Sequence, residues 1–368
     1  MGITGRDFSL LVIPLVVFIS TVTYSQSIAD LKIQADKGGV KAQAALGEAY
    51  HSGKGVPKDD SEAVRWWQKA AEQGDVLSQV NLGTVYISGT GVPKNYVAAA
   101  RWYGKAAEQG NAGAQYNLGL LYHIGVGVPK DDAEAVRWWR KAAEQGVTMA
   151  QGNLGTAYHY GTGVAKDDAE SVRWYTRAAE KGDAASQLSL GMAYVYGRGI
   201  AKDEAEGVKW LRKSADQGNA GGQFWLGAAY YSGIGVAKDY PEAVRWYRKA
   251  ADQGYAAAQY DLGQAYHSGI GVAKDYAEAV RWYRKAAEQG IAHAQYNLGL
   301  AYQSGAGVRK DDVEAYFWIN IAASSLDQAL VSQSRDSVGK ALTASELSEV
   351  QERCRKWVET HPNNQSPP

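Results

Sequence analysis

The chain has 368 residues with 39 basic and 39 acidic side chains, so its formal net charge at neutral pH is zero. Balanced charge provides no electrostatic basis for binding nucleic acid or an anionic membrane surface. A chain of this length is too long for one compact core, unless the core grows along an axis as it does in a repeat protein.

The first 27 residues differ in composition from the rest of the chain. Residues 8–22 form an apolar run, which is shorter than the about 20 residues that a membrane helix needs. Small and polar residues follow, and Thr23 with Ser25, or Ser25 with Ser27, offer cleavage positions. We predict a signal peptide at residues 1–27, a periplasmic or secreted protein, and no stable membrane span after cleavage. An uncleaved signal that anchors the chain in the membrane is the alternative.

Residues 28–39 are predicted to form an N-terminal cap. Ala35 lies 36 positions before Ala71, and Gly38 lies 36 positions before Gly74, so this stretch aligns with the end of the repeat described next. A half-repeat at this position would cover the exposed edge of the first full copy.

Eight copies of a 36-residue repeat follow, over residues 40–327. Each copy carries a Leu-Gly pair, and a Trp lies twenty residues after each Leu, from Trp66 to Trp318. The leucines that set the register are Leu46, Leu82, Leu118, Leu154, Leu190, Leu226, Leu262 and Leu298. A fixed period of this length predicts an all-α solenoid of helix-turn-helix units, in which stacking buries the apolar faces.

The first copy shows the pattern of the two helices, which we predict at residues 41–52 and 60–73. On a helical wheel the first helix has one arc whose repeat positions hardly change between copies, and this arc is predicted to pack. Its members are Ala42, Gln43, Leu46, Gly47, Ala49 and Tyr50. The opposite arc varies between copies and is predicted to face solvent. Its members are Lys41, Ala44, Ala45, Glu48, His51 and Ser52.

Two glycines, Gly53 and Gly55 in the first copy, separate the helices in every copy. A bare G-x-G is weak evidence for a phosphate-binding loop, since neither a preceding strand nor a Gly-Lys-Ser/Thr element is present. We interpret the glycines as a helix end and a tight reversal that require positive φ. Asp59 is predicted to cap the second helix, and Glu62 to complete a capping box with it.

The pattern A-x-A-Q-x-x-L-G-x-x-Y-x-x-G-x-G-V-x-K-D-x-x-E-A-V-R-W-Y-x-K-A-A-E-Q-G resembles the Sel-one-like repeat family, which is related to the tetratricopeptide repeats. The resemblance implies a right-handed α/α superhelical solenoid of eight 36-residue helix-turn-helix repeats with terminal capping helices. It also implies that the first helix of each copy lines the concave surface and that this surface serves protein–protein contacts. Bacterial members of the family are often exported.

The chain after the eighth Trp departs from the repeat. Leu326 stands where seven copies have Gly, so the last second helix is expected to continue past the usual end. Thr343 and Glu346 form a second capping box ahead of an amphipathic helix. We predict C-terminal capping helices at residues 328–360 and a disordered tail at residues 361–368.

No catalytic constellation, cofactor motif or metal site is predicted. The single cysteine, Cys354, lies on the apolar stripe of the closing helix and is interpreted as core. Four histidines, among them His51 and His159, share one repeat position. We interpret them as polar surface residues rather than metal ligands, because the pattern places no carboxylate or cysteine beside them.

Aromatic residues on the variable arc are the candidate binding site, because tyrosine is rigid and amphipathic and is favoured at interfaces. The predicted partner-binding residues are Tyr116, His123, Phe224, Tyr231, Tyr260, His267 and Tyr296. Packing between neighbouring repeats is the competing interpretation of each tyrosine. The predicted function is non-enzymatic binding of a protein or peptide along the concave face. Binding of cell-wall glycan (peptidoglycan) is the alternative, and a peptidoglycan hydrolase is a weaker one.

Overall fold

The computed structural model describes residues 27–326 and 329–361. These residues form nineteen α-helices and no strand, which confirms the predicted all-α class. The predicted signal peptide and the predicted C-terminal tail lie outside the described residues, apart from Ser27 and His361.

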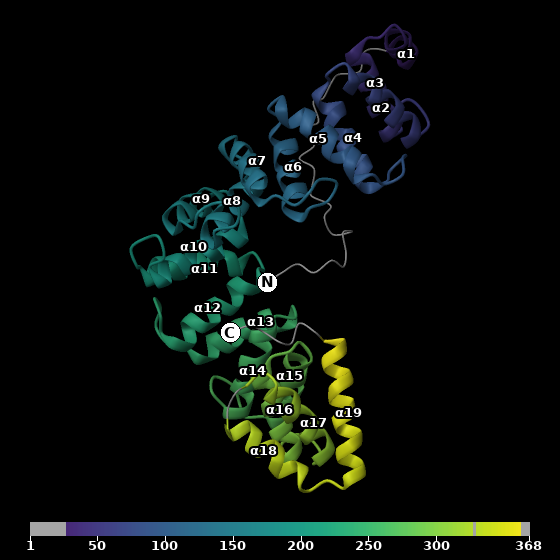
Figure 1. Cartoon of the computed structure of the whole chain (residues 1–368). Coiled ribbons are helices and arrows are strands. Elements are labelled where there is room, and N and C mark those ends of the chain that lie inside the picture. The colour runs from purple at the N-terminus through teal and green to yellow at the C-terminus, as the bar shows by residue number, and fades with distance from the viewer. Residues whose placement is uncertain (1–26, 327–328, 362–368) are drawn as a thin grey trace. The chain divides into compact units, whose positions relative to one another are not determined.

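Each of the eight copies consists of two antiparallel helices, and nearly all of these helices have thirteen residues (Figure 1). The first helices are α2 (Val40–Ser52), α4 (Val76–Ser88), α6 (Ala112–Ile124), α8 (Thr148–Tyr160), α10 (Ala184–Tyr196), α12 (Ala220–Ser232), α14 (Ala256–Ser268) and α16 (Ala292–Ser304). The second helices are α3 (Asp60–Glu72), α5 (Tyr96–Glu108), α7 (Asp132–Glu144), α9 (Asp168–Glu180), α11 (Glu204–Asp216), α13 (Tyr240–Asp252), α15 (Tyr276–Glu288) and α17 (Asp312–Ala323). These bounds agree with the prediction for the first copy to within one residue.

Three further helices lie at the ends of the array: α1 (Ile28–Asp36), α18 (Ala329–Gly339) and α19 (Ala344–Thr360). Helix α1 packs on α2, and both α18 and α19 pack on α17. The predicted capping box at Thr343 and Glu346 is present at the start of α19. The expectation that α17 runs on is wrong, because this helix ends at Ala323 and Ser324 is its C-cap.

The chain divides into two compact units, residues 1–181 and residues 182–368. We call them unit 1 and unit 2. In each unit a second helix packs on the first helix of its own copy and on the first helix of the next copy. The core of each unit therefore repeats along the chain.

The predicted capping box of the second helices is only half formed. Asp59 accepts a hydrogen bond from the backbone N–H of Glu62 at 3.0 Å, as an N-cap should. The return bond is missing because the N–H of Asp59 already donates to the carbonyl of Tyr50 at 2.9 Å. Glu62 pairs with Arg65 instead, at 3.2 Å. In all eight copies the backbone N–H of the N-cap residue donates to the carbonyl of the equivalent tyrosine. The turn between the helices therefore satisfies the N–H that the glutamate of a capping box would otherwise bind.

The loop glycines have two different roles. Gly53 ends α2 in the left-handed region, with φ of 73°, as predicted. The second glycine also allows contact between copies. A Cβ on Gly127 would lie 2.1 Å from the carbonyl oxygen of Tyr96, at the start of the preceding copy's second helix. Only glycine fits at such a close approach of two backbones.

A buried glutamine in each first helix connects successive helices. The Gln43 side chain donates to the carbonyl of Ala35 at 3.0 Å and accepts from the Gln73 side chain at 2.8 Å. The hydrogen bond between the two glutamines is missing in the fourth copy, because Lys181 stands at the position of Gln73 and donates to the carbonyl of Gly146 instead. The amide oxygen of Gln151 is consequently buried with no hydrogen-bond partner among the described residues.

The Trp of each second helix is core, as predicted, except that Trp210 is only half-buried. Trp138 is 6% exposed. A lysine three residues later covers the outer edge of the ring, and the Lys141 ammonium lies 4.3 Å from the Trp138 ring centroid. This cation–π contact lets the lysine shield the ring while its charge stays hydrated.

Candidate binding surface

The first helices are almost free of charge. Apart from histidines, the eight first helices contain only three ionisable Asp, Glu, Lys or Arg side chains, which are Lys41, Glu48 and Asp261. The second helices are rich in charge, as the sequence DAEAVRWWRKAAE of α7 shows. The exposed arcs of the first helices therefore differ chemically from the rest of the surface, and they suit contacts made by rings, amides and hydroxyls.

Three histidines at the ends of first helices bind aspartates at the starts of second helices. The Nδ1 atoms of His51, His123 and His159 lie 2.7, 2.6 and 2.9 Å from the carboxylate oxygens of their partners. The partners are Asp60, Asp132 and Asp168, nine residues further along the chain. The expectation that no carboxylate stands beside these histidines is therefore wrong, because the turn returns the chain to the same edge of the copy.

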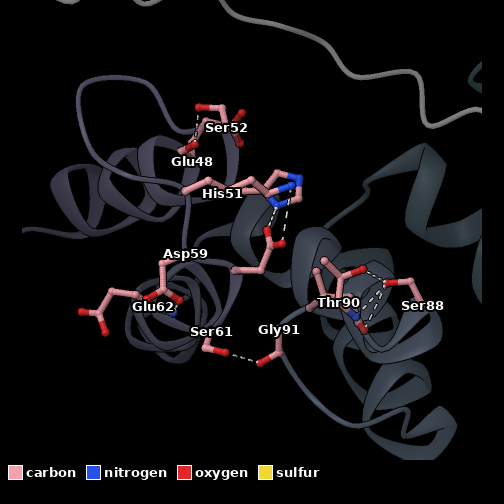
Figure 2. A network of polar contacts seen from close by, with 12 residues as sticks. Glu48, His51, Ser52, Asp59, Ser61, Glu62, Ser88, Thr90 and Gly91 are labelled. Carbon is pink, nitrogen blue, oxygen red and sulfur yellow. Dashed lines mark hydrogen bonds and ion pairs between the residues drawn. The ribbon is translucent and has the colours of Figure 1, made fainter.

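Figure 2 shows this arrangement in the first copy, where the His51 ring at the end of α2 is directed at the start of α3. A lysine two residues before the aspartate joins it, with the Lys58 ammonium 3.5 Å from the Asp60 carboxylate. Nearby, the Ser61 hydroxyl donates to the carbonyl of Gly91 in the next copy (Figure 2). These polar contacts hold the edges of neighbouring copies in place.

The His–Asp pairs do not form a metal site. In the described part of the chain, no group of three or more His, Cys, Asp or Glu side chains is placed to hold a metal ion. Each histidine has its own carboxylate in its own copy, and a protein zinc site needs at least three ligands. The pairs are best explained as contacts that join the two helices of a copy.

The same edge is aromatic in unit 2. Tyr231 stacks edge-on with Tyr240, with ring centroids 5.2 Å apart, and His267 does the same with Tyr276 at 5.2 Å. Tyr231 is 42% exposed and Tyr276 is 38% exposed. Two adjacent copies therefore present exposed pairs of rings where unit 1 presents His–Asp pairs.

The remaining predicted residues of unit 2 pack partly on the next first helix or its N-cap and, at the end of the array, on α18. The ring centroids of Phe224 and Tyr255 lie 5.1 Å apart, and those of Tyr260 and His293 lie 6.1 Å apart. The Tyr296 hydroxyl lies 3.1 Å from the Ser334 hydroxyl of α18. All three are half-buried, so each braces neighbouring helices and still presents part of its ring. We call Phe224, Tyr231, Tyr260, His267 and Tyr296 the aromatic strip.

The two predicted residues of unit 1 are placed differently. Tyr116 is only 8% exposed and packs in a buried cluster with Trp139 and Leu154, so the packing interpretation describes its position. His123 is half-buried and engaged with Asp132. The structure thus places the exposed aromatic side chains among the predicted residues in unit 2.

Asp261 lies beside the aromatic strip, and sequence reasoning did not single it out. Burial raises the pKa of its carboxyl to about 6, from an ordinary value of 3.8. Burial, and secondarily the nearness of this carboxylate, also raise the pKa values of the Tyr247 and Tyr260 hydroxyls. The available signal was its repeat position, since no other copy has an ionisable residue there. The eight residues at this position are Ala45, Asn81, Asn117, Asn153, Ser189, Trp225, Asp261 and Asn297.

Cys354 and the cap region carry no comparable site. Cys354 is 4% exposed, which confirms that it is core, and burial raises the pKa of its thiol. A cleft of about 540 Å³ lies between α17, α18 and α19, and Tyr316, Arg335 and Lys340 are among the residues that line it. Arg335 is already paired with Asp336 at 2.8 Å.

No helix in the described part of the chain combines the length and the apolar character needed to cross a membrane.

Comparison with known proteins agrees with the geometry. The family model described as Sel1 repeat matches eight successive stretches, residues 40–75, 76–111, 112–147, 148–183, 184–219, 220–255, 256–291 and 292–325. No protein of curated function matches the chain.

Two solved structures are similar to the chain over most of its length. A protective antigen of uropathogenic Escherichia coli with an SLR fold is 37% identical, with a TM-score of 0.62 over 92% of this chain and 80% of that one. A Sel1 repeat protein from Oxalobacter formigenes is 34% identical, with a TM-score of 0.67 over 84% of this chain and 90% of that one.

Proposed function

Because the chain belongs to the Sel1 repeat family, we propose that it is a non-catalytic scaffold that binds a protein or peptide partner. The partner binds along the first helices, which line a concave face, and the aromatic strip of unit 2 is the main contact. The observation that carries this proposal is the nearly uncharged surface of the first helices, on which exposed rings are grouped in two adjacent copies. Rigid aromatic side chains supply contact area at low entropic cost.

A scaffold explains the chemistry of this surface better than an enzyme does. The aspartates that bind the histidines are used within the fold. Asp261, the one Asp or Glu on the described first helices of unit 2, has tyrosines rather than an acid–base partner beside it. An enzyme would need further groups around Asp261 that position the substrate and stabilise the charge that develops in the transition state. Binding requires only a surface of the right shape and polarity.

The test compares exposed residues of the strip with a matched residue on a second helix. The full chain would be cross-linked in intact cells, and the recovered partner would then be titrated against purified variants. Tyr231→Ala and His267→Ala should each weaken binding by about 1–2 kcal/mol, as truncated interface aromatics do. Glu288→Ala on the exposed face of α15 should leave the affinity unchanged.

Two outcomes would contradict the proposal. Strong loss of binding in Glu288→Ala, with both strip variants silent, would place the contact on the second helices. Recovery of glycan strands in place of a protein, with the strip variants releasing them, would identify the surface as a peptidoglycan site. Circular dichroism of every variant controls for loss of the fold.

We also propose that the protein is exported, with cleavage near Ser25 or Ser27, and that it functions in the periplasm or outside the cell. The apolar run at residues 8–22 supports this proposal, and the similar protein from Escherichia coli is described as a protective antigen. Cell fractionation and mass spectrometry of the mature N-terminus are the measurements. Retention of residues 1–27 in the membrane fraction would favour the anchored alternative, and a cytoplasmic full-length chain would refute export.

A further inference from the structure

Asp261 is the one acid on a first helix of unit 2, and it has no counter-charge. The side chain is half-buried on α14. No hydrogen bond or ion pair joins it to any other described residue, whereas the acidic side chains at the starts of the second helices α13 and α15 are N-caps or ion-pair partners. Desolvating a carboxylate without a partner is costly, and such a group tends toward its neutral form.

The equivalent asparagines show what this repeat position does when it is neutral. Asn117 hydrogen-bonds the hydroxyl of Tyr103, on the second helix of the preceding copy. Asn297 contacts Tyr283 in the same way, and its amide also donates to the Gln264 side chain at 3.2 Å. The amide group of an asparagine thus serves the fold at this position without bringing a charge, although the amide oxygen of Asn117 is buried with no hydrogen-bond partner among the described residues.

Asp261 lies in the same relation to Tyr247, which is the counterpart of Tyr103 and Tyr283. A carboxylate has no N–H to donate, so it cannot reproduce the bonds that the asparagines make. The substitution brings a negative charge without a structural bond. An ionisable group that destabilises the fold and lies on a surface suited to binding is typical of a functional site.

We propose that Asp261 determines the specificity of the aromatic strip by receiving a basic side chain, Lys or Arg, of the protein partner. This inference rests on the proposed function and adds the chemistry of the partner. The cation would supply the missing counter-charge, and the half-buried ring of Tyr260 beside the carboxylate can add an aromatic contact to it. Asp261 is the one Asp, Glu, Lys or Arg side chain on the described first helices of unit 2, which makes it the position where a charged group of the partner is recognised.

A protein side chain fits this position better than a free metal ion. One carboxylate among phenol rings is a poor ligand set for a divalent ion, which prefers several oxygen ligands. An ammonium or guanidinium group, in contrast, combines a charge-assisted hydrogen bond with contact to aromatic faces.

The experiment selects peptides on the full chain. A library of displayed random twelve-residue peptides is enriched separately on the wild-type protein and on the Asp261→Asn variant. Asparagine already stands at this repeat position in the second, third, fourth and eighth copies. We expect Lys or Arg to be enriched on the wild type and not on the variant. A synthetic copy of a peptide selected on the wild-type protein should bind the Asp261→Asn variant at least about tenfold more weakly than it binds the wild type. Exchange of its basic residue for Gln should lower the affinity for the wild type by a similar factor.

The two changes together should cost no more than either alone, because they remove the same interaction. Equal affinities of wild type and Asp261→Asn would overturn the inference and leave the proposed function standing. Failure to select any peptide whose binding depends on Tyr231 would overturn both. Binding of N-acetyl-lysine amide as tightly as the peptide would overturn the assignment to a protein side chain. Since Asp261→Asn should fold at least as well as wild type, lost binding could not be attributed to unfolding.

Discussion

Replacing Asp261 by Asn should stabilise the protein at neutral pH and have no effect in acid. The carboxyl has a pKa of about 6 in the folded chain against 3.8 as the ordinary value. A folded-state pKa above the unfolded value means that the folded protein holds the proton more tightly, so stability falls as pH rises from 3.8 through 6. The shift of 6 − 3.8 = 2.2 pKa units corresponds to about 3 kcal/mol. Residual exposure reduces this figure, so we expect a gain of about 1–3 kcal/mol for Asp261→Asn above pH 7.

The assay is urea denaturation of both proteins at pH 7.5 and at pH 4, followed by circular dichroism and tryptophan fluorescence. His267 of α14 and His293 of α16 are present in both proteins, so their contributions cancel in the difference. Tyr247 of α13 and Tyr260 of α14 stay neutral throughout, because their pKa values are raised. A difference in midpoint that is the same at both pH values, or a destabilised variant at pH 7.5, would refute the reasoning.

The mirror-image change is the control for this prediction. Asn297→Asp places a carboxylate in the same relation to Tyr283 and removes a donor to Gln264. It should destabilise the protein at pH 7.5 and less so at pH 4. A neutral outcome at both pH values would show that this repeat position tolerates charge, and the argument from Asp261 would lose its basis.

Four other substitutions test the packing. Trp138→Ala should cost about 3–5 kcal/mol, as large-to-small core changes do, and an unchanged melting temperature would place the ring outside the core. Lys181→Gln should supply the donor that the buried amide oxygen of Gln151 lacks and raise the free energy of unfolding by about 0.5–1.5 kcal/mol, whereas a loss of stability would contradict the role assigned to the buried glutamines. Gly127→Ala should cost about 3 kcal/mol or more, because strain at positive φ is joined by a backbone clash. Gly110 has a φ of 90° and open space around an added methyl, so Gly110→Ala should cost only about 1 kcal/mol of stability. Equal losses of stability in the two glycine variants would refute the close backbone approach at Gly127.

The repeat and its local structure could be predicted from the sequence because they depend on residues that are close together along the chain. The arcs of the first helix, the Asp59 cap and the positive φ of Gly53 each follow from a short pattern repeated eight times. Repetition also averages out the ambiguity of any single helix prediction. The core position of the Trp of the second helix followed in the same way.

Contacts across the turn were decided by tertiary structure. Asp60 lies nine residues from His51, and only the path of the loop brings the two side chains to 2.7 Å. Glu62 fits the spacing of a capping box, yet the carbonyl of Tyr50 takes the N–H of Asp59 that Glu62 would have bound. In both cases the deciding partner belongs to the other helix of the copy, which a linear pattern does not show.

The site depended on tertiary structure even more. Tyr116 and Tyr260 share a repeat position and a residue type, but Tyr116 is covered in a buried cluster and Tyr260 remains half-exposed beside Asp261. The sequence by itself determined that a helical repeat scaffold forms and which arc of it varies. Only the packing of neighbouring copies decided which aromatic rings reach solvent and which carboxylate is left without a partner, because burial and electrostatic environment depend on residues from three or more helices at once.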